Sequence, residues 1–401
     1  MNYLFEKAEA YLNELSIEIP ERAIGTEGNL RATLYFSEIM KRFNFKITSL
    51  KFDCIDWVHR KSELVSSGKT YPVLACPYTL PCNVSSELVI ISERTAFKNK
   101  NISGKIALLK GDIVKEQLIP KNFKFYNPEE HLELHELLEN SGLKAIIAAT
   151  SRDPGLAGGM YPFPFTEDGD FNIPSAYMKD VDGEEFAECL GKTVSLIIDS
   201  NRISSKGYNI SANIGNGAGK KIIVCAHIDS KLGSPGAIDN ASGVVVLMLL
   251  GELLEKYSGK FDIELVALNG EDYFSTPGQL KYLEKLENEK SEIELVINMD
   301  GAGYYEVNTA ISTYNCEPEF DDHINAVFLK RKSIERGEEW VQSDHSMFAQ
   351  QGIKCIAITS MNMIEKLCYD VTHTEKDVPE IIDCRKLVDI AAAIRDFIDS
   401  L

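Results

Sequence analysis

The chain has 401 residues, a formal net charge of −19 at pH 7, and fractions of hydrophobic (44%) and charged (26%) residues that are ordinary for a globular protein. The length predicts two or three domains, and the acidic balance argues against nucleic-acid binding because it repels phosphate backbones. No segment comes near the roughly 18 uncharged apolar residues that a membrane span needs. The nine cysteines are scattered singly and without a CxxC pair, which argues against a disulfide framework and against a zinc knuckle.

The first 50 residues are predicted to be helical and then strand-like. Apolar side chains of residues 1–20 repeat at helical spacing, and Glu6 and Glu9 stand where a signal peptide would need a basic start and an apolar block. We therefore expect a helix at this end of the chain and a cytoplasmic protein.

The middle of the chain, residues 66–203, differs from the rest in its pattern of predicted elements. It holds short strand-like segments such as "SELVIIS", "GKIALLKG" and "GLKAIIAAT", separated by glycine and proline turns, with few helical patterns. We interpret it as a smaller β-rich domain inserted into a larger, discontinuous domain made of residues 1–65 and 204–401.

From about residue 220 onward, strand-like and helix-like segments alternate. "KKIIVCA", "FDIELVALNG", "EIELVINMDG" and "GIKCIAITS" are uniformly apolar, whereas "GQLKYLEKLENE" and the C-terminal "DCRKLVDIAAAIRDFIDSL" have helical periodicity. Uniformly apolar strands alternating with helices predict an α/β fold with a mixed, largely parallel central sheet sandwiched by helices.

Acids and imidazoles follow these strands repeatedly. They are His227, Asp229, Asp239, Glu271, Asp272, Asp300 and His373. Any one aspartate has an ordinary structural explanation, since Asp239 can cap the helix that begins near Ala241. Together, however, they would crowd carboxylates into one site at the carboxyl ends of the strands, where they repel one another unless cations lie among them. Mixed histidine and carboxylate ligands favour zinc, with manganese or cobalt as substitutes.

The number of ligands favours two metal ions. His227 and Asp272 can hold different ions, Asp239 can bridge them, and Asp300 and His373 can complete the two ligand sets. Glu271 is then available as a general base for a water that the metals activate, because two ions about 3.5–4 Å apart can ionise a shared water. Asp229, two residues after His227, can orient its imidazole.

The segments "AHIDS", "GAIDNASGV", "NGED", "NMDG", "SDHSMF" and "THTEKD", in this order, resemble the M28 family of zinc aminopeptidases. The resemblance implies two zinc ions held by His227, Asp239, Asp272, Asp300 and His373, with Glu271 as the base and a peptide with a free N-terminus as substrate. It includes the "GTEGN" loop at residues 25–29, and the β-rich middle resembles the protease-associated domain that some members carry.

Two departures from the family pattern stand out. Asp272 occupies a position where the family usually has glutamate, and Thr372 precedes the late histidine where some members have tyrosine. Two alternative functions remain open: a carboxypeptidase or deacylase with the same metal centre, and a non-catalytic binding protein of the same fold.

Three further candidates have ordinary structural interpretations. "HLELH" places His131 and His135 at the spacing of a zinc-binding HExxH helix, but it lacks the glutamate after the first histidine, and we expect a solvated helix. Cys225 is interpreted as a buried strand thiol and not as a soft metal ligand. His345 either lines the substrate site or begins a helix.

Overall fold

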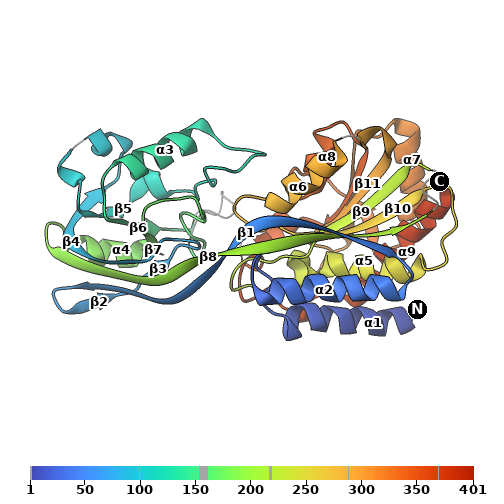
Figure 1. Cartoon of the computed structure of the whole chain (residues 1–401), viewed down its shortest axis with the longest axis horizontal. Coiled ribbons are helices and arrows are strands. Elements are labelled where there is room, and N and C mark those ends of the chain that lie inside the picture. The colour runs from blue at the N-terminus through green and yellow to red at the C-terminus, as the bar shows by residue number, and fades with distance from the viewer. Residues whose placement is uncertain (1, 99, 153–160, 216–218, 288, 369) are drawn as a thin grey trace. The chain divides into compact units, whose positions relative to one another are not determined.

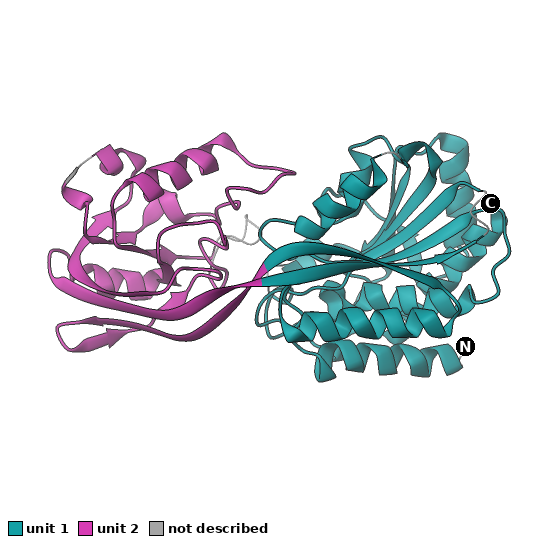
Figure 2. Cartoon of the chain, viewed as in Figure 1, with its two compact units in different colours: residues 1–54, 205–401 teal, residues 55–204 magenta. Residues whose placement is uncertain are grey.

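The computed structural model describes residues 2–98, 100–152, 161–215, 219–287, 289–368 and 370–401. The chain forms two compact units, unit 1 with residues 1–54 and 205–401 and unit 2 with residues 55–204 (Figure 2). Two long strands, β1 (Lys46–Ser66) and β8 (Thr193–Ile214), each contribute residues to both units. The sequence placed the divisions after residues 65 and 203. The division after residue 54 falls inside β1, where no loop or change of composition marks it.

The sheet of unit 1 has the strand order β13-β12-β14-β11-β9-β10-β8. Strands β10, β9, β11 and β14 run parallel to one another, whereas β8 and β12 are antiparallel to their neighbours β10 and β14. The strands are β9 (Lys221–His227), β10 (Asp262–Leu268), β11 (Ile293–Met299), β12 (Thr309–Tyr314), β13 (Ile334–Arg336) and β14 (Cys355–Ser360). The predicted α/β fold with a largely parallel central sheet is confirmed.

Helices cover both faces of this sheet (Figure 1). One face shares a continuous apolar core with α1 (Asn2–Asn13), α2 (Glu27–Arg42), α5 (Ser242–Leu253) and α9 (Cys384–Ser400), and Ile324, Val327 and Phe328 of α7 (Pro318–Phe328) belong to the same core. Helix α5 is apolar on all sides and is buried from Ser242 to Gly251, as expected for a helix enclosed by its neighbours. The other helices of unit 1 are α6 (Pro277–Leu286) and α8 (His345–Ala349), and the rings of Tyr282 in α6 and Phe348 in α8 pack edge to face.

Unit 2 has its own sheet, in the order β8-β4-β5-β6-β7-β3. Strands β4 to β7 are parallel, and β3 and β8 are antiparallel to their neighbours. Its strands are β2 (Lys69–Tyr71), β3 (Leu74–Ala75), β4 (Cys82–Ile91), β5 (Ile106–Leu109), β6 (Ala145–Thr150) and β7 (Ser175–Lys179). The buried apolar side chains of this unit form two clusters, both of which include residues of the sheet. The unit also contains helices α3 (Glu129–Asn140) and α4 (Asp180–Ala187). Across the described ranges of the whole chain, no helix is both long and apolar enough to cross a membrane.

Candidate metal centre

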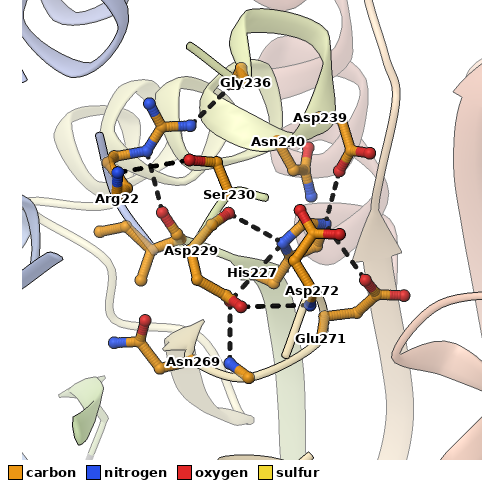
Figure 3. A network of polar contacts seen from close by, with 12 residues as sticks. Arg22, His227, Asp229, Ser230, Gly236, Asp239, Asn240, Asn269, Glu271 and Asp272 are labelled. Atoms are coloured by element: carbon orange, nitrogen blue, oxygen red, sulfur yellow. Dashed lines mark hydrogen bonds and ion pairs between the residues drawn. The ribbon is translucent and has the colours of Figure 1, made fainter. Parts of the chain in front are cut away.

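The candidate ligands lie at one edge of the unit 1 sheet because they follow neighbouring parallel strands. His227 is the last residue of β9, Asp272 comes after β10, and Asp300 directly follows β11. Since β10, β9 and β11 are adjacent and parallel, their carboxyl ends meet at the same edge. Figure 3 shows the side chains of His227, Asp239, Glu271 and Asp272 gathered there.

Asp239 reaches this edge from a short, irregular turn of helix, Ala237–Ala241, that precedes α5. Gly236 begins the turn with φ 59°, a left-handed conformation that glycine adopts without strain. A Cβ at Gly236 would lie 2.5 Å from the carbonyl oxygen of Asp239 and 2.6 Å from the Cβ of Ser230, so no larger residue fits. The chain therefore turns tightly enough to bring Asp239 back beside His227.

Five side chains form two groups that share one member. The first group is His227, Asp239 and Asp300, and the second is Asp239, Asp272 and His373. In each group, one ligand atom from every residue lies within 4.8 Å of the others.

The distances within the groups show that Asp239 faces both histidines. Its Oδ1 lies 3.2 Å from Nε2 of His227, and its Oδ2 lies 3.1 Å from Nε2 of His373. His373 Nε2 is also 3.1 Å from Asp272 Oδ1, and His227 Nε2 is 3.5 Å from Asp300 Oδ1. The two oxygens of one carboxylate thus serve different groups.

The nitrogen and oxygen atoms of these groups are arranged to bind metal ions and not to form hydrogen bonds with one another. Among the buried polar atoms of the described chain, His227 Nε2, Asp272 Oδ2 and Asp300 Oδ1 have no hydrogen-bond partner, although an unpaired buried polar atom is destabilising. Nδ1 of His227 lies 3.2 Å from the backbone carbonyl oxygen of Asp229, so it is the protonated nitrogen of the neutral ring. Nε2 then directs its lone pair at Asp239 and Asp300, as a metal ligand would.

Without a metal, the histidines take the positive charge that the carboxylates require. Burial disfavours the charged form of His373, but Asp272 and Asp239 outweigh it and raise its pKa to about 10. For His227, burial is likewise outweighed by Asp300, Asp229 and Asp239, and its pKa lies well above the ordinary value. Burial alone would raise the pKa of Asp239, but the contacts with both histidines lower it. The cluster therefore needs cations to exist in a buried site.

Glu271 lies beside these groups without belonging to either. Its carboxylate is 4.0 Å from His227 Nε2, and about a quarter of its side chain is exposed. Burial, together with Asp300, Asp272 and Asp344, raises the pKa of Glu271 well above its ordinary value despite the opposing effect of His227. It is an acid or base next to the ligands with partial access to solvent.

Asp229 connects the two strand ends that carry the ligands. Its carboxylate accepts the backbone N–H of Gly270 (2.8 Å) and of Asp272 (3.1 Å), and its Oδ1 is 3.7 Å from Nδ1 of His227 (Figure 3). The imidazole's close contact is with the carbonyl oxygen of Asp229, while the carboxylate holds the loop that carries Glu271 and Asp272.

Sequence reasoning missed Arg22, whose guanidinium is completely buried beside the site. It donates to the carbonyl oxygens of Ile228 (3.0 Å), Leu15 (2.5 Å), Pro235 (2.7 Å) and Gly236 (2.7 Å). Burial lowers the pKa of Arg22 to about 10, against the opposing effect of four nearby aspartates. No sequence signal marks it, because its partners are backbone atoms.

Asp344 was also missed. It is 3% exposed, and its Oδ1 accepts a hydrogen bond from Nε2 of Gln279 (3.0 Å), while its Oδ2 has no partner within the described residues. His345, the next residue, begins α8 and is fully buried between the rings of Tyr314 and Trp340, so it is a helix-start residue inside the core.

The histidine pair of "HLELH" is buried, so the expectation of a solvated helix is wrong for these two side chains. His131 Nδ1 accepts the N–H of Ile119 (3.0 Å), and His135 Nε2 lies 2.9 Å from the Ile119 carbonyl oxygen, so the pair holds one loop residue against α3. His131, Glu116 and Glu130 also lie close together, but a neutral His131 that accepts at Nδ1 carries its proton on Nε2 and has no lone pair for a metal.

Cys225 is a buried strand thiol, as the sequence predicted. Its Sγ lies 3.4 Å from Oδ1 of Asn298.

A largely parallel sheet carries histidine and carboxylate side chains at the carboxyl ends of its central strands, so the chain is of the class of α/β proteins with a candidate metal centre at the sheet edge. Residues 209–398 match the family model described as peptidase family M28. The resemblance inferred from the sequence motifs is thereby confirmed.

Two individual proteins are also similar to this chain. The chain is 22% identical over 315 residues to aminopeptidase YwaD of Bacillus subtilis, covering 75% of this chain and 63% of that protein. It is 34% identical over 110 residues to the uncharacterized protein YfbL of Escherichia coli, covering 24% of this chain and 33% of that protein. The chain thus spans less than two thirds of the length of these relatives.

Solved structures share the fold of the whole chain. The crystal structure of BSAP, a zinc aminopeptidase from Bacillus subtilis, is 21% identical with a TM-score of 0.77, covering 99% of this chain and 95% of that one. An aminopeptidase from Aneurinibacillus sp. strain AM-1 is 19% identical with a TM-score of 0.75, covering 98% and 93%. At these identities the likeness establishes the fold.

Proposed function

We propose that the chain is a metal-dependent aminopeptidase that binds two zinc ions and removes N-terminal residues from peptides. The observation that carries the proposal is the sharing of Asp239 between two groups of buried donor atoms, several of which have no other partner within the described residues. Zinc suits histidine and carboxylate donors, with manganese or cobalt as substitutes. The zinc aminopeptidase BSAP, which has this fold, supports the choice.

The five residues of the two groups are the proposed ligands. His227 and Asp300 would hold one ion, Asp272 and His373 the other, and Asp239 would bridge them. Bound zinc supplies a Lewis acid that lowers the pKa of a water toward ~7 and polarises the carbonyl of the scissile bond.

Glu271 is the proposed general base. It lies beside the ligands, is partly exposed, and has a raised pKa, so its carboxylate is suited to accept a proton from the attacking water and to pass it to the leaving amine. Asp229 would position this base, since it holds the amides of Gly270 and Asp272 on either side of it.

The charge of the chain favours a free N-terminus over a free C-terminus as the substrate end that is bound. With a formal net charge of −19 at pH 7, the protein attracts the cationic amine of a peptide N-terminus and repels a C-terminal carboxylate. For unit 2 we propose a protease-associated-like domain. Its fold is shared with BSAP, whose structure the chain matches over 99% of its length.

The test is to remove the metal with a chelator and to assay a panel of aminoacyl chromogenic substrates before and after zinc is restored. We expect activity that disappears with the metal and returns with zinc. Cleavage that survives N-terminal blocking but is lost on C-terminal blocking would instead identify a carboxypeptidase or deacylase. A zinc content near zero, or activity without metal, would contradict the proposal, and the former would favour a binding protein.

A further inference from the structure

A second buried carboxylate, Asp377, holds the backbone of the segment that carries Asp239. Asp377 is fully buried. Its Oδ1 accepts the N–H of Ile238 (2.6 Å), its Oδ2 accepts the N–H of Asp239 (3.1 Å), and its carbonyl oxygen accepts the N–H of Ala237 (3.2 Å). One residue therefore binds three consecutive amides of this turn.

The turn cannot supply these hydrogen bonds itself. Asp239 (φ −122°, ψ 83°) and Asn240 (φ −140°, ψ 43°) lie outside the helical region, so the amides that precede α5 have few partners within their own segment. Buried amides without hydrogen-bond partners destabilise the folded state. The side chain of Asp377 meets that need on one side.

Three further hydrogen bonds hold the same segment. Arg22 donates to the carbonyl oxygens of Pro235 and Gly236, and Asn240 donates its side-chain amide to the carbonyl oxygen of Met299 (2.8 Å). The path from Pro235 to Asn240 is thus fixed by two side chains from other parts of unit 1, Arg22 and Asp377, and by the bond from Asn240 to the backbone of Met299. Among the described residues, Asp377 is the one that accepts the amide of Asp239.

Asp377 also belongs to the segment "THTEKD" that provides His373. Its backbone N–H bonds to the carbonyl oxygen of Thr374 (3.2 Å), which keeps the segment between the two residues in a compact turn. The hydrogen bonds that Asp377 accepts from residues 237–239 therefore set where Asp239 lies relative to His373, whose Nε2 is 3.1 Å from Asp239 Oδ2.

We infer that Asp377 is a positioning residue for the metal pair, and that it acts by fixing the backbone of Asp239 against the loop of His373. The inference rests on the proposed function, because it needs Asp239 to bridge two ions. Replacing a residue that holds a metal ligand in position, without binding the metal itself, typically weakens metal binding by about 10- to 100-fold. Asp377 does so through backbone amides, and it touches neither ion nor substrate.

The test compares Asp377→Asn with Asp168→Asn in zinc titrations of metal-free protein in competition with a chelator. Asp168 is the matched control in unit 2, since it is also buried and its carboxylate accepts two backbone amides, from Lys121 (2.9 Å) and Asp170 (2.7 Å). We expect D377N to bind zinc about 10- to 100-fold more weakly than wild type, and D168N to bind as wild type does. Thermal unfolding of the metal-free proteins checks that both variants are folded.

An affinity of D377N equal to that of wild type, or an equal loss in D168N, would overturn the inference. Wild-type protein that binds no zinc would instead count against the proposed function, so the two failures are distinct. If D377N folds only with zinc present, the rate of zinc release to excess chelator replaces the titration. We then expect release about 10- to 100-fold faster than from wild type, and an unchanged rate would again refute the positioning role.

Discussion

Replacing Asp344 with asparagine is expected to stabilise the metal-free protein at neutral and alkaline pH. Asp344 is almost completely buried. Burial raises its pKa to about 7, and Asp229 and Asp300 add to this rise while His227 and the hydrogen bond from Gln279 oppose it. Asparagine has the same shape, keeps an acceptor for Gln279 and carries no charge.

The size of the effect follows from the difference between the folded and the ordinary pKa. In the folded state Asp344 holds its proton up to about pH 7, whereas in the unfolded chain it loses the proton near 3.8. Between these values the folded state binds more protons, so the free energy of unfolding falls as the pH rises through this window and stays low above it. The shift of about 3 pH units corresponds to about 4 kcal/mol, of which about 2 kcal/mol is lost between about pH 5.5 and 7.

The assay is urea unfolding of chelator-treated protein at about pH 5.5 and at about pH 8, on either side of the upper end of this window. The chain has two tryptophans. In a Trp57→Phe background the fluorescence reports Trp340, whose ring centroid is 4.6 Å from that of His345, next to the substituted position.

We expect the stability advantage of D344N to grow by about 2 kcal/mol from the lower to the higher pH. Asp322→Asn, which removes the same charge from an exposed position on α7, is expected to run parallel to wild type. A difference between D344N and wild type that is the same at both pH values would refute the reasoning.

Three further substitutions test other parts of the site and fold. Glu271→Gln is expected to reduce kcat by about 10²- to 10⁴-fold with the zinc content unchanged, and a loss of zinc would show that Glu271 is a ligand. Arg22→Lys removes the planar fork that reaches four carbonyl oxygens, and a fall of at least about 3 kcal/mol in the free energy of unfolding is expected; a fall below about 1 kcal/mol would contradict the contacts. Gly278→Ala places a Cβ 1.8 Å from the carbonyl oxygen of Asn269, so denaturant unfolding should show a loss of about 1–3 kcal/mol, and an unchanged midpoint would argue against this close approach.

The sequence predicted the sheet of unit 1 because its central strands are apolar throughout and are separated by helical patterns. Strands buried on both faces leave such runs, and β9, β10 and β11 do so. The boundary between the units was less visible. It falls within β1 and β8, where an extended strand continues from one unit to the other without a turn, a proline or a change in composition.

The candidate ligands were predictable for a related reason. A parallel sheet brings the ends of adjacent strands together, so His227, Asp272 and Asp300 could be placed at one edge from their position after a strand. His373 was also expected after a strand, although the helical turn Ile364–Cys368 lies between the end of β14 and this residue.

The roles of Arg22 and Asp377 could not be predicted in this way, although Asp377 stands in the "THTEKD" motif. Arg22 and the carboxylate of Asp377 bind backbone atoms of segments that are distant in the sequence. Every residue type has the same backbone carbonyl group, and every type except proline has the same backbone N–H group. Such partners leave no trace in residue identity or spacing. Only the folded chain shows which carbonyl oxygens and amides lie within reach.

The two kinds of histidine in this chain show what residue spacing leaves undetermined. His131 and His227 are both buried and both lie near carboxylates. What separates them is the partner of Nδ1: the ring of His131 accepts a backbone N–H there, whereas that of His227 donates to a backbone carbonyl. Only the second arrangement leaves a lone pair on Nε2 of the neutral ring, so only His227 is prepared to bind a metal. Because the difference lies in a backbone group beside the ring, the same residue types can produce a candidate metal ligand in one unit and a loop contact in the other.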